Sequence, residues 1–228
     1  MTPDLTWLPV LLQTSDALFP TGAYAHSLGF EEFARVAGVR DEAALRAFVE
    51  EHLLPALQCQ ELPYLRFAYD AAMNAGLCEI DCEISAWKLP REAREASTQI
   101  GRRRLAALRA VNEQNAYLEF AEAVARGEAH GNHLAVAALQ ARAENFPLRA
   151  ALAAWLYQSI SGVCSAALKI IRIGQEGCQR VLRQALADAE AIVCGSLEIA
   201  RDDAGWMDPL LEIAAMRHEF AEERLFIS

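Results

Sequence analysis

The chain has 228 residues, of which 54% are hydrophobic and 23% are charged. These proportions are those of a globular protein rather than a disordered one, and the length is ample for one sizeable core. The formal net charge is −10. Because phosphate groups would repel such a chain, we expect it to bind neither nucleic acid nor a membrane surface.

The first twenty residues contain no basic region and no small-residue cleavage site, so they do not read as a signal peptide. We therefore expect a cytoplasmic protein. In that compartment the six cysteines should stay reduced.

The apolar residues recur with a helical period, and alanine is frequent throughout, which predicts an all-α fold. Gly38 should end the second helix and Asp41 should cap the third. Pro55 and Pro63 are expected to kink or divide the helix that follows. In chain order, the expected helices cover residues 5–14, 29–36, 41–76 with those two interruptions, 90–111, 114–126, 132–143, 147–173, 179–200 and 209 onward.

The longest expected helix runs from about Pro147 to about Ile173. Its residues 150–168 carry no charge, which reaches the length of a membrane-spanning helix. Small and polar residues such as Gln158 and Ser161 interrupt the apolar run, so we expect a buried core helix instead. The chain is then a single domain, residues 1–228, with about nine or ten helices around this central one.

Catalytic motifs are not evident. The only two lysines, Lys88 and Lys169, do not follow a glycine, which excludes a phosphate-binding P-loop. The Gly-x-Ser-x-Gly pattern of a hydrolase is missing. The paired acids at 31–32, 50–51 and 222–223 and the arginines at 102–104 are expected to lie on solvated helix faces. We therefore do not expect an enzyme.

Candidate metal ligands occur only as two separate pairs. Cys78 and Cys82 are spaced to share a helix face, as are His130 and His133, but a structural metal site needs four ligands. We expect no metal site, with the cysteines as half-buried free thiols, His130 in a loop and His133 at a helix end. A transient metal contact at these residues stays open.

Two segments are more specific than a plain helical bundle requires. The first lies within a loop expected over residues 16–27 and continues to Glu31, and it is rich in Pro, Gly, Tyr, His and Ser. The second, which we call the tail, covers residues 216–228 and ends in an apolar cluster, although chain ends are usually polar. An apolar tail on an acidic protein suggests a docking element.

Together these segments resemble the UreF family of urease accessory proteins. The first segment matches that family at Phe19-Pro20, Gly22, Tyr24, His26-Ser27, Gly29 and Glu31. The tail matches it at Met216, Arg217, His218 and Glu219 and again at Arg224, Leu225 and Phe226. Between them, residues 91–97, 133–134, 173–175 and 179–180 fit in the same order. The resemblance spans nearly the whole chain.

The resemblance implies an all-helical, non-catalytic scaffold that tends to form a homodimer. Such proteins bind the accessory protein UreD, also called UreH. The pair recruits the GTPase UreG, which brings nickel to apo-urease. The resemblance therefore implies a chaperone in nickel metallocentre assembly that holds no cofactor of its own.

The same resemblance indicates which residues bind partners. We expect the tail to dock near the first loop when UreD/UreH binds. Arg224 would then donate hydrogen bonds to loop carbonyls or stack on Tyr24, and Leu225 and Phe226 would fill an apolar pocket. The alternative is that the tail simply covers the protein's own core. Gln175 and Arg180 form a second candidate surface, for UreG, or only a helix end and turn. The expected partner-binding residues are Pro20, Gly22, Tyr24, His26, Ser27, Gly29, Gln175, Arg180, Met216, Arg217, His218, Glu219, Arg224, Leu225 and Phe226.

Two other readings remain. One is a helical enzyme of the haem-oxygenase or thiaminase-like type, with His26 or His133 and glutamates in a bundle pocket. The other is a helical transcription regulator, against which the net charge of −10 argues.

Overall fold

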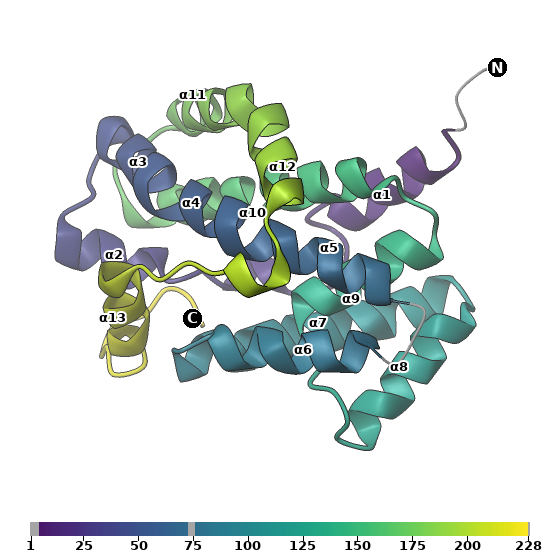
Figure 1. Ribbon diagram of the computed structural model, residues 1–228. Coiled ribbons are helices and arrows are strands. Elements are labelled where there is room, and N and C mark those ends of the chain that lie inside the picture. Colours follow the sequence, from purple (N-terminus) through teal and green to yellow (C-terminus); the bar gives the residue numbers. More distant parts are fainter. Residues whose placement is uncertain (1–4, 73–75, 228) are drawn as a thin grey trace.

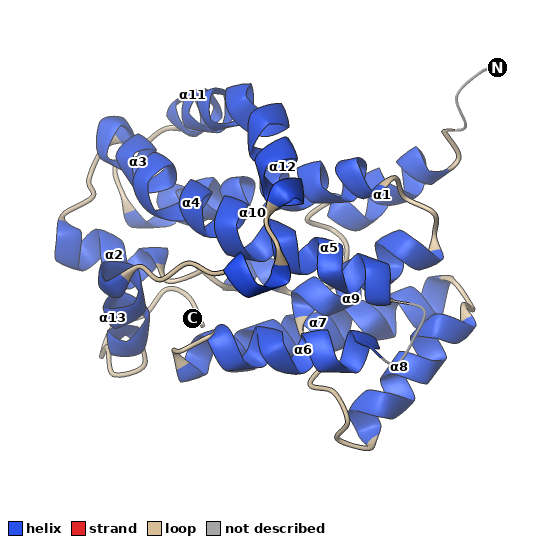
Figure 2. Ribbon diagram, in the orientation of Figure 1, coloured by secondary structure: helices blue, strands red, loops and turns tan. Residues whose placement is uncertain are grey.

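The computed structural model describes residues 5–72 and 76–227, and within these ranges the regular structure is entirely helical (Figures 1 and 2). This confirms the all-α prediction. The α-helices are α1 (Trp7–Ser15), α2 (Phe30–Ala37), α3 (Glu42–Phe48), α4 (Leu54–Ala56), α5 (Leu62–Ala71), α6 (Gly76–Trp87), α7 (Arg91–Val111), α8 (Asn115–Ala125), α9 (His133–Ala143), α10 (Leu148–Ile170), α11 (Gln175–Ala185), α12 (Ala189–Glu198) and α13 (Pro209–His218). Short 3₁₀ turns cover Ala23–Ala25, Leu186–Asp188 and Arg201–Asp203.

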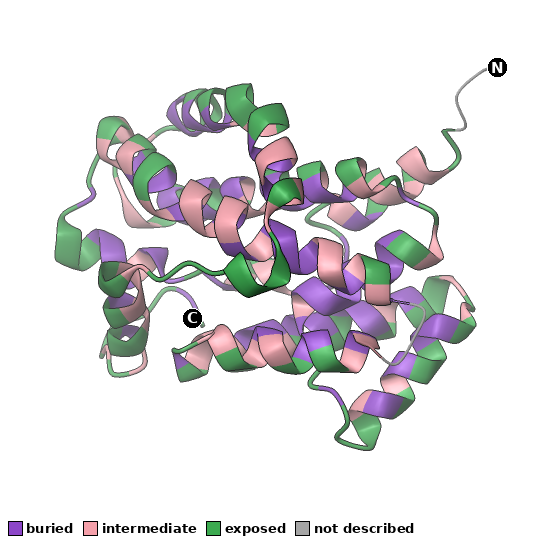
Figure 3. Cartoon of the chain, in the orientation of Figure 1, coloured by how far each residue is buried: buried purple, intermediate pink, exposed green. Residues whose placement is uncertain are grey.

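The central helix is α10, as predicted. Leu152, Leu156 and Ile160 on it are completely buried, and Figure 3 shows buried residues along the inward faces of the bundle. In the described part of the chain, α10 is the one helix whose length and composition would suit a membrane crossing, and half of its most apolar stretch is buried inside the protein. Its neighbours are α1, α2, α5, α9, α11 and α12. A helix surrounded in this way needs apolar side chains on several faces, which explains its composition.

The boundaries of α2 and α3 follow from two residues that the sequence singled out. Gly38 ends α2 with a φ of 73°, a left-handed conformation that glycine adopts without strain. The side chain of Asp41 accepts a hydrogen bond from the backbone N–H of Ala44, 2.9 Å away, and so begins α3. Both predictions are confirmed.

The two prolines do not break the helix between α3 and α5. The backbone stays helical from Glu42 to Ala71 because π-helical turns at Val49–Leu53 and Leu57–Glu61 precede Pro55 and Pro63. Leu54, just before Pro55, bonds five residues back to the carbonyl of Val49. The wider turn makes room where a proline ring would crowd the preceding turn. Of the two predicted alternatives, division of the helix at these residues was wrong, whereas the two π-helical turns do interrupt the regular α-helix there.

Three further boundaries differ from prediction. Helix α6 occupies a stretch for which no separate helix was predicted. The predicted helix over residues 179–200 is two helices, α11 and α12, joined by a 3₁₀ turn, and α10 ends three residues before Ile173. Gly174 is the residue before α11 begins.

A chain of buried polar groups ties α7, α9 and α1 together. The guanidinium of Arg104 donates to Oε1 of Gln140 at 2.7 and 3.1 Å, and the Gln140 amide donates to the hydroxyl of Thr14 at 3.0 Å. Burial lowers the pKa of Arg104 to about 10. The prediction of a solvated arginine face therefore holds for Arg102 and Arg103 but is wrong for Arg104.

The loop before α9 is fixed in a different way. The buried carboxylate of Asp81, on α6, accepts hydrogen bonds from the backbone N–H groups of His130, Gly131 and Asn132. Gly101 on α7 lies so close to this loop that a Cβ there would sit 2.1 Å from the carbonyl oxygen of Gly131.

Candidate functional site

The first loop turns sharply at Gly22. This glycine has a φ of 76°, and a Cβ on it would approach Nη1 of Arg103 to 2.6 Å. The loop therefore packs closely against the Arg103 side chain of α7. Its side chains divide into two groups: Pro20 and Tyr24 point outward, whereas His26 and Ser27 are buried. Burial and the nearby positive charge of Arg103 lower the pKa of His26, which favours the neutral imidazole.

Gly29 allows α2 to lie directly against α13. Its φ of 82° is left-handed, and a Cβ on it would meet Leu211 at 3.3 Å and Ala215 at 3.4 Å. The start of α2 therefore brings Glu31 close to α13 and to the tail, whose first residues form the end of α13 (Figure 1).

His218, at the end of α13, lies between two carboxylates from different helices. Its Nδ1 is 2.8 Å from Oε2 of Glu92 on α7, and its Nε2 is 3.1 Å from Oε2 of Glu31 on α2. The ring is almost completely buried. Both ring nitrogens of His218 therefore face a carboxylate oxygen, one from α7 and one from α2.

The tail returns to the first loop through backbone hydrogen bonds. Glu31 accepts from the N–H of Leu225 at 2.8 Å and from that of Phe226 at 3.1 Å. The N–H of Ile227 donates to the carbonyl of Ala25 at 2.9 Å. The Phe226 side chain is 5% exposed, and the ammonium of Lys169 lies 5.0 Å from its ring centre.

Ion pairs surround this contact. Arg224 donates to Oε1 of Glu92 at 2.8 Å, and Arg91 pairs with Glu219. Glu32, whose side chain is 2% exposed, is held by Arg35 at 2.6 Å and by Arg217 at 3.3 Å. We call Glu31, Glu32, Glu92, His218 and Arg224 the tail cluster. It joins α2, α7, α13 and the tail.

The tail of the chain alone differs in several details from the docking expected with UreD/UreH. It already lies against the first loop. Arg224 pairs with Glu92 rather than with loop carbonyls or Tyr24. Leu225 does not fill a pocket, because its side chain is 67% exposed and only Phe226 is buried.

The acidic pairs also need correction. Glu31 and Glu32 were predicted to be solvated, but both belong to the tail cluster, whereas Glu50 and Glu51 are exposed as predicted. Glu31, Glu32 and Glu92 are the members that sequence reasoning missed as site residues, although Glu31 was among the residues that matched the family. The only signal for Glu92 was its place in the run of residues 91–97 that matched the family.

The second candidate surface lies on another part of the molecule. Gln175 is the first residue of α11 and is exposed. Arg180, one turn further on, is also exposed and forms a two-pronged ion pair with Glu42 on α3, with distances of 2.9 and 2.7 Å. Figure 1 shows α11 well separated from α13. The two candidate surfaces are therefore distinct.

The four weak metal candidates do not converge. Within residues 5–72 and 76–227, no three His, Cys, Asp or Glu side chains are grouped to hold an ion. Burial, together with nearby Asp81, raises the pKa of the Cys78 and Cys82 thiols, which disfavours the thiolate that a metal would need. His130 is exposed in its loop, whereas His133 packs against Trp155 inside the bundle.

The match to known proteins extends well beyond these segments. The model of the UreF family matches residues 39–186, more than half of the chain. The chain belongs to the UreF family. A protein named urease accessory protein UreF from Arthrobacter sp. (strain FB24) is 36% identical over 218 residues, which are 96% of each chain. Two other proteins of the same name are similar. That of Paenarthrobacter aurescens (strain TC1) is 34% identical, and the alignment covers 98% of this chain and 99% of the relative. That of Haemophilus influenzae (strain PittEE) is 31% identical, and the alignment covers 99% of this chain and 97% of the relative.

The UreF assignment confirms the resemblance drawn from the two unusual segments. The family model covers neither the first loop nor the tail, whereas the alignments with the relatives cover nearly the whole chain. The tail cluster joins these two segments although they lie at opposite ends of the sequence.

Proposed function

We propose that the chain is a urease accessory protein that works as a non-catalytic scaffold in nickel metallocentre assembly. The observation that carries this proposal is the tail cluster, which holds the first loop and the tail together as one surface. Membership in the UreF family and the printed names of its relatives support it. Nickel is then the cargo of the assembled complex, the scaffold holds no cofactor of its own, and the protein acts in the cytoplasm.

The joined surface is the proposed binding site for UreD/UreH. Buried charges fix the backbone there, while large apolar side chains remain exposed around it, namely those of Tyr24 (72%), Leu28 (52%), Leu225 (67%) and Ile227 (55%). Exposed apolar groups on a rigid, well-anchored backbone are typical of protein interfaces. The pair would then recruit UreG to apo-urease, and we assign the separate face at Gln175 and Arg180 to UreG. We further propose that the scaffold acts as a homodimer.

The test is co-purification with UreD/UreH. Tyr24→Ala and Leu225→Ala remove exposed side chains, so the folded protein should persist while binding weakens by about tenfold or more. Leu118→Ala is the matched control, because Leu118 is 44% exposed on α8, on the other side of the molecule (Figure 1). Unchanged binding by both loop and tail variants would exclude this surface.

UreG recruitment has its own test. Arg180→Ala should leave the binding of UreD/UreH intact and reduce the capture of UreG by the complex. Equal capture of UreG by the variant would remove the assignment of this second surface. Sedimentation of the purified chain alone would test the homodimer.

A further inference from the structure

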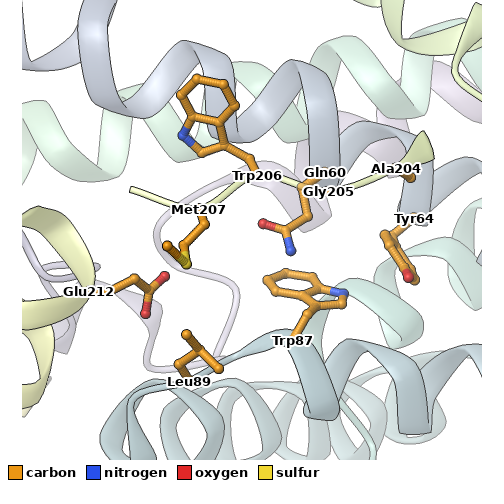
Figure 4. Close-up of a pocket in the computed structure, with 9 residues that line it drawn as sticks. All are labelled: Gln60, Tyr64, Trp87, Leu89, Ala204, Gly205, Trp206, Met207 and Glu212. Atoms are coloured by element: carbon orange, nitrogen blue, oxygen red, sulfur yellow. The ribbon is translucent and has the colours of Figure 1, made fainter. Parts of the chain in front are cut away.

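An open cavity of about 520 Å³ lies away from the tail cluster, between the C-terminal end of α6, the segment before α13 and the first turn of α13 (Figure 4). Its volume is in the range of sites that hold a ligand or a partner's side chain. The lining residues are Gln60, Tyr64, Trp87, Leu89, Ala204, Gly205, Trp206, Met207 and Glu212.

The walls of the cavity are mostly aromatic and apolar. Trp87 forms its floor in Figure 4, and Leu89, Trp206 and Met207 stand at its rim, each at least 40% exposed. Trp87 already accepts a cation on its ring, since the ammonium of Lys88 lies 4.2 Å from the ring centre. Aromatic rings of this kind attract positively charged groups.

Glu212 supplies a carboxylate at one side. Figure 4 shows it directed into the cavity, and its Oε2 is buried with no hydrogen-bond partner among the described residues. Burial raises the pKa of this carboxyl group, and the positive charge of Lys88 offsets only part of that effect. Gln60, which is almost fully buried, extends its amide toward the same space above Trp87.

The basic groups nearby are already engaged with other acids. His52 pairs with Asp208, Lys88 lies 3.8 Å from Glu61, and Arg201 pairs with Glu79 and Glu83. None of these reaches ion-pair distance of Glu212 in the described structure. Lys88, whose ammonium lies over the Trp87 ring, acts on Glu212 through its charge alone, so among the described residues no cation pairs directly with this carboxylate.

We propose that this cavity binds the guanidinium group of an arginine side chain presented by a partner protein. A planar guanidinium can stack on an aromatic ring and donate two hydrogen bonds to one carboxylate, which matches Trp87 and Glu212. The net charge of −10 favours a basic partner. The exposed apolar side chains of Leu89 and Met207 at the rim supply the surface that an interface with a protein requires. This inference does not depend on which proteins the tail cluster binds.

The test uses N-acetyl-arginine amide as the probe, with N-acetyl-citrulline amide as its neutral isostere. In ¹⁵N-labelled protein, the indole N–H signals of Trp87 and Trp206 should shift saturably with the arginine probe at millimolar concentration. Binding of the citrulline probe should be at least about tenfold weaker, because it lacks the charge. Glu212→Gln should weaken arginine binding by a similar factor.

Two further variants distinguish a loss of arginine binding from a loss of folding. Met207→Lys changes a residue that is 64% exposed, so it should fold normally and repel the arginine probe. Glu119→Gln changes an exposed carboxylate on α8 and should leave binding unchanged. Equal affinity for the two probes, no effect of Met207→Lys, or no shift of either indole signal would overturn the proposal. Because no partner protein is used, these outcomes do not bear on the function proposed for the tail cluster.

Discussion

Nε2 of His218 lies 3.1 Å from Oε2 of Glu31, although 187 residues separate them in the sequence. This contact links the end of α13 to the start of α2. The same carboxylate accepts two backbone N–H groups of the tail, so one side chain secures both elements.

Replacing Glu31 should therefore release the tail without unfolding the protein. In Glu31→Ala, the amides of Leu225 and Phe226 lose their acceptor, and their hydrogen exchange should accelerate by about tenfold or more. Mass spectrometry of peptides from residues 219–227 would measure this. Glu119→Ala, on exposed α8, is the control and should leave their exchange unchanged. Equal exchange in both variants would contradict the anchoring role of Glu31.

Two neighbouring tail residues should differ in their effect on stability. Phe226→Ala removes a buried ring and should lower the free energy of unfolding by roughly 2–4 kcal/mol. Leu225→Ala removes an exposed side chain and should change it by less than about 0.5 kcal/mol. Urea denaturation followed by circular dichroism would measure both. Similar values for the two variants would mean that the tail does not pack as described.

Glu32 should make the stability depend on pH in the acid range. The hydrogen bond from Arg35, joined by the charge of Arg217, lowers the pKa of Glu32 below its usual value of 4.5. The unfolded chain then binds this proton more readily, so the stabilisation is fully present above the unfolded pKa and is lost as the pH falls through the lower, folded value. Glu32→Gln should flatten this part of the curve and, at pH 7, reduce stability by about 1–3 kcal/mol. Melting temperatures between pH 3 and pH 7 would test it, with Glu119→Gln keeping the original slope.

Two glycines in helices should respond oppositely to alanine. Gly101→Ala places a methyl group on the backbone of the loop before α9 and should destabilise the protein by roughly 3 kcal/mol or more. Gly162→Ala, on α10, meets nothing within 4 Å and should stabilise it by up to about 1 kcal/mol. Thermal unfolding of both variants is the measurement. Tolerance of Gly101→Ala would show that α7 does not approach this loop so closely.

The local parts of the fold were predictable from the sequence because local signals determine them. Gly38 and Asp41 ended and began helices as expected, since the left-handed glycine and the carboxylate cap act within a few residues. Pro55 and Pro63 were predicted to kink or divide the helix. A π-helical turn before each proline lets the backbone stay helical, and no local sequence pattern predicts such a turn.

The candidate site was predictable only in part, because it is built from distant segments. The first loop and the tail were identified by resemblance, but Glu92 meets His218 across 126 residues, and no periodicity reports such a contact. Glu31 and Glu32 resembled an ordinary solvated pair for the same reason. Their partners lie on α13 and the tail, so burial could be known only from the packed structure.

Glu31 recognises the peptide backbone of residues 225 and 226, not their side chains. Position 225 is therefore free to carry almost any amino acid while the path of the chain stays the same. Only proline, which has no N–H to offer, would break this anchor directly. Substitutions at position 225 can therefore change which partner surface the exposed side chain recognises, while the backbone hydrogen bonds to Glu31 stay the same.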